Sequence, residues 1–118
     1  MDIMERVNML KDCDMINEEA YSDILSIINI FKEDFSIILD EDNAGVMITH
    51  MSMAFRRNET KEKIEPISRD TYNQAVELEE YQKASEILDK IEQATKNELS
   101  NDEKEFFIVH ICTLLLNV

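Results

Sequence analysis

The sequence contains two histidines, and each lies within a helical pattern that is rich in apolar residues. His50 lies in residues 48–57 and His110 lies in residues 102–111. Histidine is the side chain whose protonation equilibrium lies near neutral pH, and its ring nitrogens can bind a proton, a metal or a phosphoryl group. The two imidazoles are therefore the first candidates for chemistry in this chain.

Arg57 stands two helical turns after His50, on the same face of the expected helix. Arginine is a preferred partner of phosphate, because its planar guanidinium donates two parallel hydrogen bonds. An imidazole with a guanidinium nearby suits a phosphorylated histidine. The alternative is a histidine at the edge of the core, with Arg57 paired to one of the many acidic residues.

Glu103 lies seven residues before His110, again on one face of a helix. A carboxylate in this position could orient the imidazole or raise its pKa, and so fix which ring nitrogen is free to react. The alternative is a core helix without chemistry. Its support is the run of apolar residues around His110, namely Phe106, Phe107, Ile108, Val109 and Ile111.

Other chemistries have weaker support. There is no H-x-x-x-H, E-x-x-H or C-x-x-C spacing, so neither a metal nor another cofactor is expected, although a small metal- or ligand-binding protein stays a minor alternative. The single glycine, Gly45, rules out a glycine-rich phosphate loop. Ser52 lies near His50, but a serine hydrolase is not expected on so short and helical a chain. Of the seven methionines, Met47, Met51 and Met53 surround His50 and would suit a helix–helix interface.

The charge of the chain narrows its partners. The sequence has 26 acidic and 12 basic residues and a net charge of −14, which repels nucleic acid and anionic membranes and suits a partner with a basic patch. No apolar segment approaches the roughly 20 residues that span a bilayer, and no signal peptide is evident, so a cytoplasmic protein is expected. Cys13 and Cys112 make a poor disulfide framework, and Cys112 is expected to be a buried thiol.

One glycine and one proline in 118 residues favour an all-α fold, and the length favours one domain over residues 1–118. Five or six helices can be placed along the sequence, and we expect them to form a compact antiparallel bundle of about five. The third helix, capped by Asp42 or Asn43, carries His50; residues 58–65 are expected to be a mobile charged connection; and a capping-box pattern at 100–103 opens the His110 helix. The other expected helices span residues 3–11, 18–35, 68–76 and 79–96.

The two histidine segments resemble the two signature segments of the PTS regulation domain (PRD), an all-helical module of bacterial antiterminators and transcriptional activators. The residues that match the first signature are His50, Met51, Ser52, Met53, Ala54, Phe55, Arg56 and Arg57. Those that match the second are Asp102, Glu103, Phe106, Phe107, His110 and Ile111. Tyr81 and Ala84 resemble the aromatic and alanine of the family's fourth helix.

The resemblance implies a dimeric module whose His50 and His110 accept phosphoryl groups from the phosphocarrier protein of the sugar phosphotransferase system (PTS) or from a sugar-specific component. Arg57 would steady the first site and Glu103 would orient the second. Family members commonly carry two such modules behind an RNA- or DNA-binding domain, whereas this sequence has one and is similar to stand-alone versions. The resemblance therefore implies a phospho-regulated binding module and not an enzyme; the alternative is a helical adaptor or dimerisation module that keeps only the fold.

Overall fold

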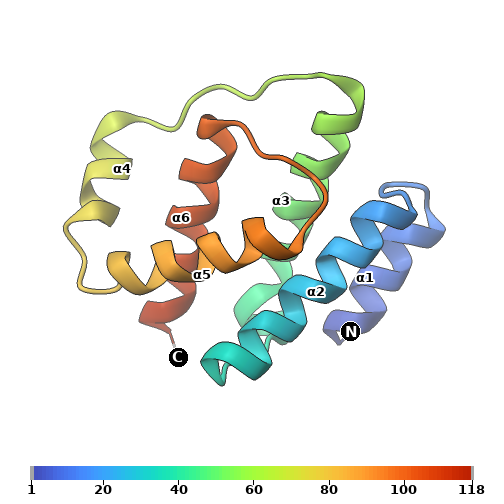
Figure 1. Ribbon diagram of the computed structural model, residues 1–118, viewed down its shortest axis with the longest axis horizontal. Helices are drawn as coiled ribbons and strands as arrows, with labels where there is room; N and C mark the ends of the chain where they lie inside the picture. Colours follow the sequence, from blue (N-terminus) through green and yellow to red (C-terminus); the bar gives the residue numbers. More distant parts are fainter. Residues whose placement is uncertain (1, 118) are drawn as a thin grey trace.

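A computed structural model describes residues 2–117 of the chain, and in this range it consists of helices joined by loops. The helices are α1 (Ile3–Asp12), α2 (Glu18–Phe35), α3 (Glu41–Thr60), α4 (Arg69–Val76), α5 (Tyr81–Ala94) and α6 (Asn101–Leu116). The all-α class is confirmed, with six helices in the described range rather than about five. The expected antiparallel bundle is too simple a description, because α5 runs across α6 instead of alongside it (Figure 1).

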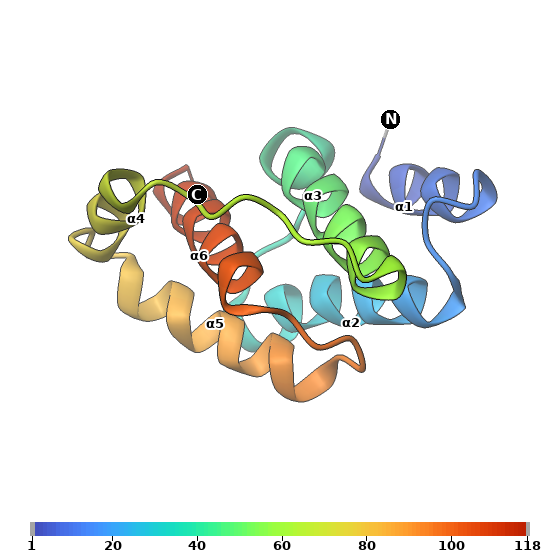
Figure 2. The same cartoon turned by 90° about the horizontal axis from the view of Figure 1, so that it is seen from above.

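The helices lie in two layers. Helices α4, α6, α3 and α1 stand side by side in one layer, and α5 and α2 lie across the other face of α6 and α3 (Figure 2). The apolar side chains between the layers form one core. Its largest fully buried members are Phe31, Phe55, Phe107, Ile24, Ile27, Ile48, Met51, Ile87, Ile91 and Ile111. Because α3 and α6 occupy the middle of the first layer, the core holds them at a fixed distance from each other.

Five of the helices begin with a side chain that accepts a hydrogen bond from a backbone N–H in the first turn, which satisfies one of the otherwise unpaired donors there. The capping residues are Asp2, Asn17, Asp40, Ser68 and Ser100. In α3 the cap is Asp40, so the prediction of Asp42 or Asn43 was wrong by two to three residues. The reason is a reciprocal capping box: Asn43 N–H donates to Asp40 and the Asp40 N–H donates to the Asn43 side chain, each at 2.8 Å.

Helix α3 continues to Thr60, so the first three residues of the expected mobile connection are helical. It ends where Lys61 takes a left-handed conformation with φ 65°, and the carbonyl of Arg57 then accepts the N–H groups of Lys61 and Glu62. The connection over residues 61–68 passes the N-terminal end of α6 and leads to α4 (Figure 1). It therefore lies close to the ends of both histidine helices.

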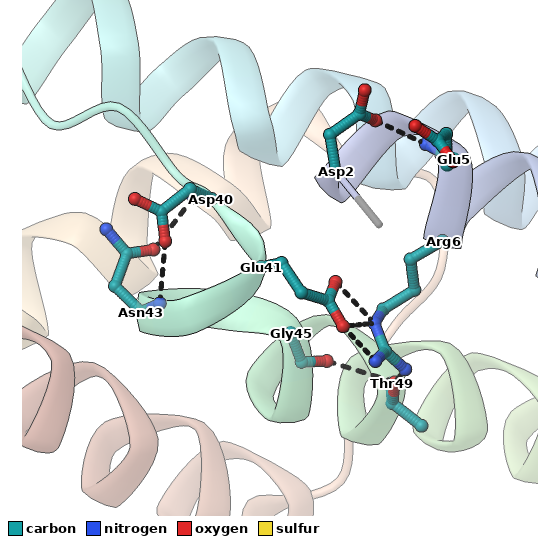
Figure 3. A network of polar contacts seen from close by, with 8 residues as sticks. All are labelled: Asp2, Glu5, Arg6, Asp40, Glu41, Asn43, Gly45 and Thr49. Carbon is teal, nitrogen blue, oxygen red and sulfur yellow. Dashed lines mark hydrogen bonds and ion pairs between the residues drawn. The ribbon is translucent and has the colours of Figure 1, made fainter.

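Helix α1 is attached to α3 by a polar network (Figure 3). The Arg6 guanidinium donates from Nε to both carboxylate oxygens of Glu41, at 3.0 and 2.9 Å, and from Nη1 to the hydroxyl of Thr49 at 3.0 Å. Thr49 in turn donates to the carbonyl of Gly45 at 3.0 Å. These contacts fix α1 against the half of α3 that precedes His50.

The loop between α5 and α6 is attached to α2 by Asp23, which is only 2% exposed. Its carboxylate accepts the backbone N–H groups of Lys96 and Asn97 at 3.0 Å and the Asn97 side-chain amide at 2.6 Å. A buried carboxylate is tolerated when such donors replace its water. The Asp23 contacts thus help to set where α6 starts.

The structure also bears on the predictions for the cysteines and for a membrane-spanning helix. Cys112 is buried and Cys13 is exposed, and both thiols are free, as predicted. Between residues 2 and 117, no helix combines the length and the apolar character that crossing a membrane requires.

Candidate functional site

The neighbouring helices α3 and α6 bring the two histidines into direct contact. Nδ1 of His50 and Nε2 of His110 are 3.1 Å apart, which is hydrogen-bond distance. The ring centroids are 4.7 Å apart and the ring planes are 78° to each other, an edge-on arrangement. Residues 60 positions apart in the sequence therefore form one pair. The sequence singled out both histidines but contained no signal for their contact.

The two rings differ in their surroundings. His50, on α3, is exposed, whereas His110, on α6, is partly buried. Burial, and to a lesser extent the charge on the nearby His50, lowers the pKa of His110 below its ordinary value of 6.5. The expectation that a carboxylate would raise this pKa was wrong, because the group that meets the ring is a second imidazole. His110 is therefore held neutral at pH 7.

Arg57 and Glu103 also meet, and they join the same two helices. The Arg57 guanidinium donates from Nε to one oxygen of Glu103 at 2.8 Å and from Nη2 to the other at 3.1 Å. Glu103 is 7% exposed, so this is a largely buried bidentate ion pair. The carboxylate that was expected to hold the His110 ring thus holds Arg57, and His50 is the hydrogen-bond partner of His110. At the start of α6, Ser100 caps the Glu103 N–H at 3.3 Å, while the Glu103 side chain is committed to Arg57.

All four residues line one cavity of about 280 Å³. The other lining residues are Phe106 and Phe107 from α6 and Ile64 and Glu65 from the connection between α3 and α4. The cavity thus combines two imidazoles, a guanidinium paired to a carboxylate, and apolar walls. Sequence reasoning had no means to find Ile64 and Glu65, because they belong to a charged loop whose path depends on the whole fold.

The other polar neighbours of His50 are occupied elsewhere. Ser52 is buried and its hydroxyl donates to the carbonyl of Ile48 at 2.8 Å, so it is not a nucleophile facing the cavity. Thr49 is used in the contact with α1. Within residues 2–117, no three His, Cys, Asp or Glu side chains are grouped as metal ligands would be. The chemistry that this site offers is that of imidazole nitrogens beside a guanidinium.

The family model described as the PRD domain matches residues 25–113, which include most of α2, all of α3 to α5 and α6 as far as Thr113. Helix α1 precedes the matched segment. No curated protein and no solved structure is similar enough to count as a match.

Proposed function

Because this chain belongs to the PRD family, a family of regulatory modules of the phosphotransferase system, we propose that His50 and His110 are its phosphoryl-accepting residues. The donor would be the PTS phosphocarrier protein or a sugar-specific PTS component. Phosphorylation would change how the module dimerises or binds a protein effector. The observation that carries this proposal is the contact of the two imidazoles at 3.1 Å in a cavity that also contains Arg57.

The site has the parts that phosphoryl transfer needs. A neutral imidazole has an unprotonated nitrogen whose lone pair can attack phosphorus. His50 is exposed, so a donor protein can reach it, and the lowered pKa of His110 keeps the second ring neutral at physiological pH. The net charge of −14 favours a donor that docks through a basic surface.

The added group would disturb an existing contact. A phosphoryl group brings about −1.5 to −2 charges at pH 7 and strong acceptor oxygens. Glu65 and Glu103 line the same cavity, so the new charge is repelled unless it finds a cation. Arg57 is the cationic side chain in the cavity lining, and it is already bound to Glu103. The phosphoryl group and the Glu103 carboxylate therefore compete for one guanidinium.

This competition gives a physical route from phosphorylation to a change in shape. If Arg57 turns from Glu103 to the phosphoryl group, α3 and α6 lose the ion pair that joins them, and a largely buried carboxylate loses its partner. The relative position of α3 and α6 must then adjust. Both helices present side chains on the surface around the cavity. The adjustment would therefore change the surface that a binding partner or a second copy of the chain contacts.

The test is phosphoryl transfer in a reconstituted system. Incubation with phosphoenolpyruvate and the phosphocarrier system is expected to label the protein. His50→Ala or His110→Ala is expected to reduce the label, and the double variant is expected to remove it. Arg69→Ala is a matched control, since it removes an arginine that pairs with α6 outside the cavity, and it should label normally. If neither the general donor nor any sugar-specific donor labels the wild-type protein, the proposal is wrong.

One observation favours a second candidate, a helical adaptor or dimerisation module that does not use the histidines chemically. On the outer face of α3, one turn before and one turn after His50, Val46 is 67% exposed and Met53 is 43% exposed. Apolar side chains in such positions suit a helix–helix interface between two protomers. This candidate predicts that both His→Ala variants dimerise and bind their partner like the wild type. Light scattering during gel filtration, before and after incubation with the phosphoryl donors, distinguishes this candidate from the phospho-regulated module.

A further inference from the structure

We propose that the two rings act as a single acceptor, so that each protomer carries one phosphoryl group, on Nε2 of His50 or on Nδ1 of His110. The exposed His50 would be the main site. This inference rests on the proposed function, and it adds which nitrogen reacts and how many groups one protomer can hold.

The contact between the rings excludes two of the four ring nitrogens. Nδ1 of His50 and Nε2 of His110 face each other at 3.1 Å, and there is no room between them for a phosphorus atom. A group on either inner nitrogen would have to push the other ring away, and both helices are held in place by the core. The outer nitrogens, Nε2 of His50 and Nδ1 of His110, are the two that remain.

The shared proton makes these outer nitrogens alternatives. When both rings are neutral, one proton lies between the inner nitrogens, and it belongs to one ring or the other. If His50 Nδ1 carries it, His50 Nε2 has a free lone pair and His110 Nδ1 is protonated. If His110 Nε2 carries it, the situation is reversed. At any moment, therefore, only one outer nitrogen of the neutral pair is a nucleophile.

The transfer step balances within this pair. The lone pair of His50 Nε2 attacks phosphorus in a donor phosphohistidine. The donor's N–P bond breaks, and its electron pair stays on the donor ring, which takes a proton from water. The attacked His50 ring becomes a cation with its proton on Nδ1. Nε2 of His110 accepts the hydrogen bond from this proton at 3.1 Å, or takes the proton, and so stabilises the product.

A second transfer to the same protomer meets two obstacles. While Nδ1 of the phosphorylated His50 keeps the shared proton, Nδ1 of neutral His110 is protonated and has no lone pair with which to attack phosphorus. Two phosphoryl groups would also place like charges in one cavity. Among the described residues that line this cavity, Arg57 is the cation. One guanidinium can pair with one phosphoryl group, and Glu65 and Glu103 add further negative charge.

The experiment uses a small phosphoryl donor, phosphoramidate, so that it does not depend on which protein is the natural donor. The folded chain and the same chain unfolded in urea are treated side by side. Intact mass spectrometry counts the phosphoryl groups on each chain. Antibodies specific for the two phosphohistidine isomers, and long-range proton–nitrogen NMR of the rings, identify the nitrogen.

We expect the folded chain to take one group, mainly as the Nε2 isomer on His50, and the unfolded chain to take two. Folded chains that carry two groups, or a group on His50 Nδ1 or His110 Nε2, would overturn the inference and leave the proposed function standing. A folded chain that takes none while the unfolded chain takes two would show that the rings are inaccessible, which overturns both. Labelling here without labelling by PTS proteins would overturn the proposed function alone.

Discussion

Arg57 and Glu103 form a bidentate ion pair that joins α3 to α6 beside the histidine contact, with N–O distances of 2.8 and 3.1 Å. The two histidine helices are thus connected at two neighbouring points, a ring pair and an ion pair. Any change in the charge of one connection acts on the other, because both line the same cavity.

Arg57→Ala is expected to destabilise the protein by about 2–3 kcal/mol, since it removes a charge-assisted hydrogen bond and leaves the largely buried Glu103 carboxylate without its partner. Urea unfolding followed by circular dichroism measures the loss. The control is Arg69→Ala, which breaks the pair with Glu105 at an exposed position and should cost much less. Equal losses for the two variants would show that burial of Glu103 does not matter.

The lowered pKa of His110 predicts that the stability of the protein depends on pH. The pKa of His110 in the folded protein lies below the ordinary value of 6.5, so in mildly acidic solution the unfolded chain binds a proton that the folded chain does not. The free energy of unfolding should therefore fall as the pH drops below 6.5, until the lowered pKa is reached. The other ionisable residues that line the cavity beside His110 are His50, Arg57, Glu65 and Glu103.

His110→Gln tests this assignment, because glutamine keeps a polar partner for His50 but does not titrate. Unfolding curves between pH 7 and about pH 5 should be flatter for the variant than for the wild type in this range. The carboxylates that titrate at the acidic end are present in both proteins and cancel in the difference. An unchanged slope would mean that His110 is not the residue that carries the effect.

Asp23→Ala is expected to cost about 3 kcal/mol, because it leaves the backbone N–H groups of Lys96 and Asn97 without an acceptor. Hydrogen exchange should show the loss locally, as reduced protection in the loop between α5 and α6. Asp23→Asn keeps the size and one acceptor oxygen, so a smaller loss is expected. Loop protection that is the same in the alanine variant and the wild type would contradict this role of Asp23.

Gly45→Ala is expected to weaken the attachment of α1 to α3. A Cβ at this position would lie 3.1 Å from the carboxyl carbon of Glu41, so that side chain must shift by a few tenths of an ångström against Arg6. Alanine also favours the helix by about 1 kcal/mol, so global stability should change little. Faster hydrogen exchange in α1 is the expected result, with Arg6→Ala as the reference variant. Exchange that is faster in the reference but unchanged in Gly45→Ala would show that Glu41 can make room.

Much of this fold could be predicted from residue types and spacing. Capping residues such as Asn17 and Ser100, and the apolar period through Ala84, Leu88 and Ile91, indicate helices by local chemistry, and these helices are present. The prediction of the α3 cap failed for a local reason, but the predictions that failed at the candidate site depended on contacts between distant residues. Glu103 looked like a partner of His110 because the two share a helix face, yet Arg57 from another helix binds it.

The same limit applies to the site. Both histidines could be selected because imidazole is rare in this chain and chemically versatile. Their contact could not, since it depends on how α3 and α6 lie against each other, and that is decided by the buried residues of six helices. The cavity residues contributed by the connection, Ile64 and Glu65, depend on a path with no repeating pattern.

The attachment of Arg6 to Glu41 and Thr49 has a practical consequence for anyone shortening this protein. A fragment cut at the borders of the family match would start inside α2 and lack α1 altogether. It would remove the buried side chains of Val7 and Leu10 from the core and leave both the Glu41 carboxylate and the hydroxyl of Thr49, the residue before His50, without Arg6. The packed structure therefore extends further toward the N-terminus than the segment that the family model matches.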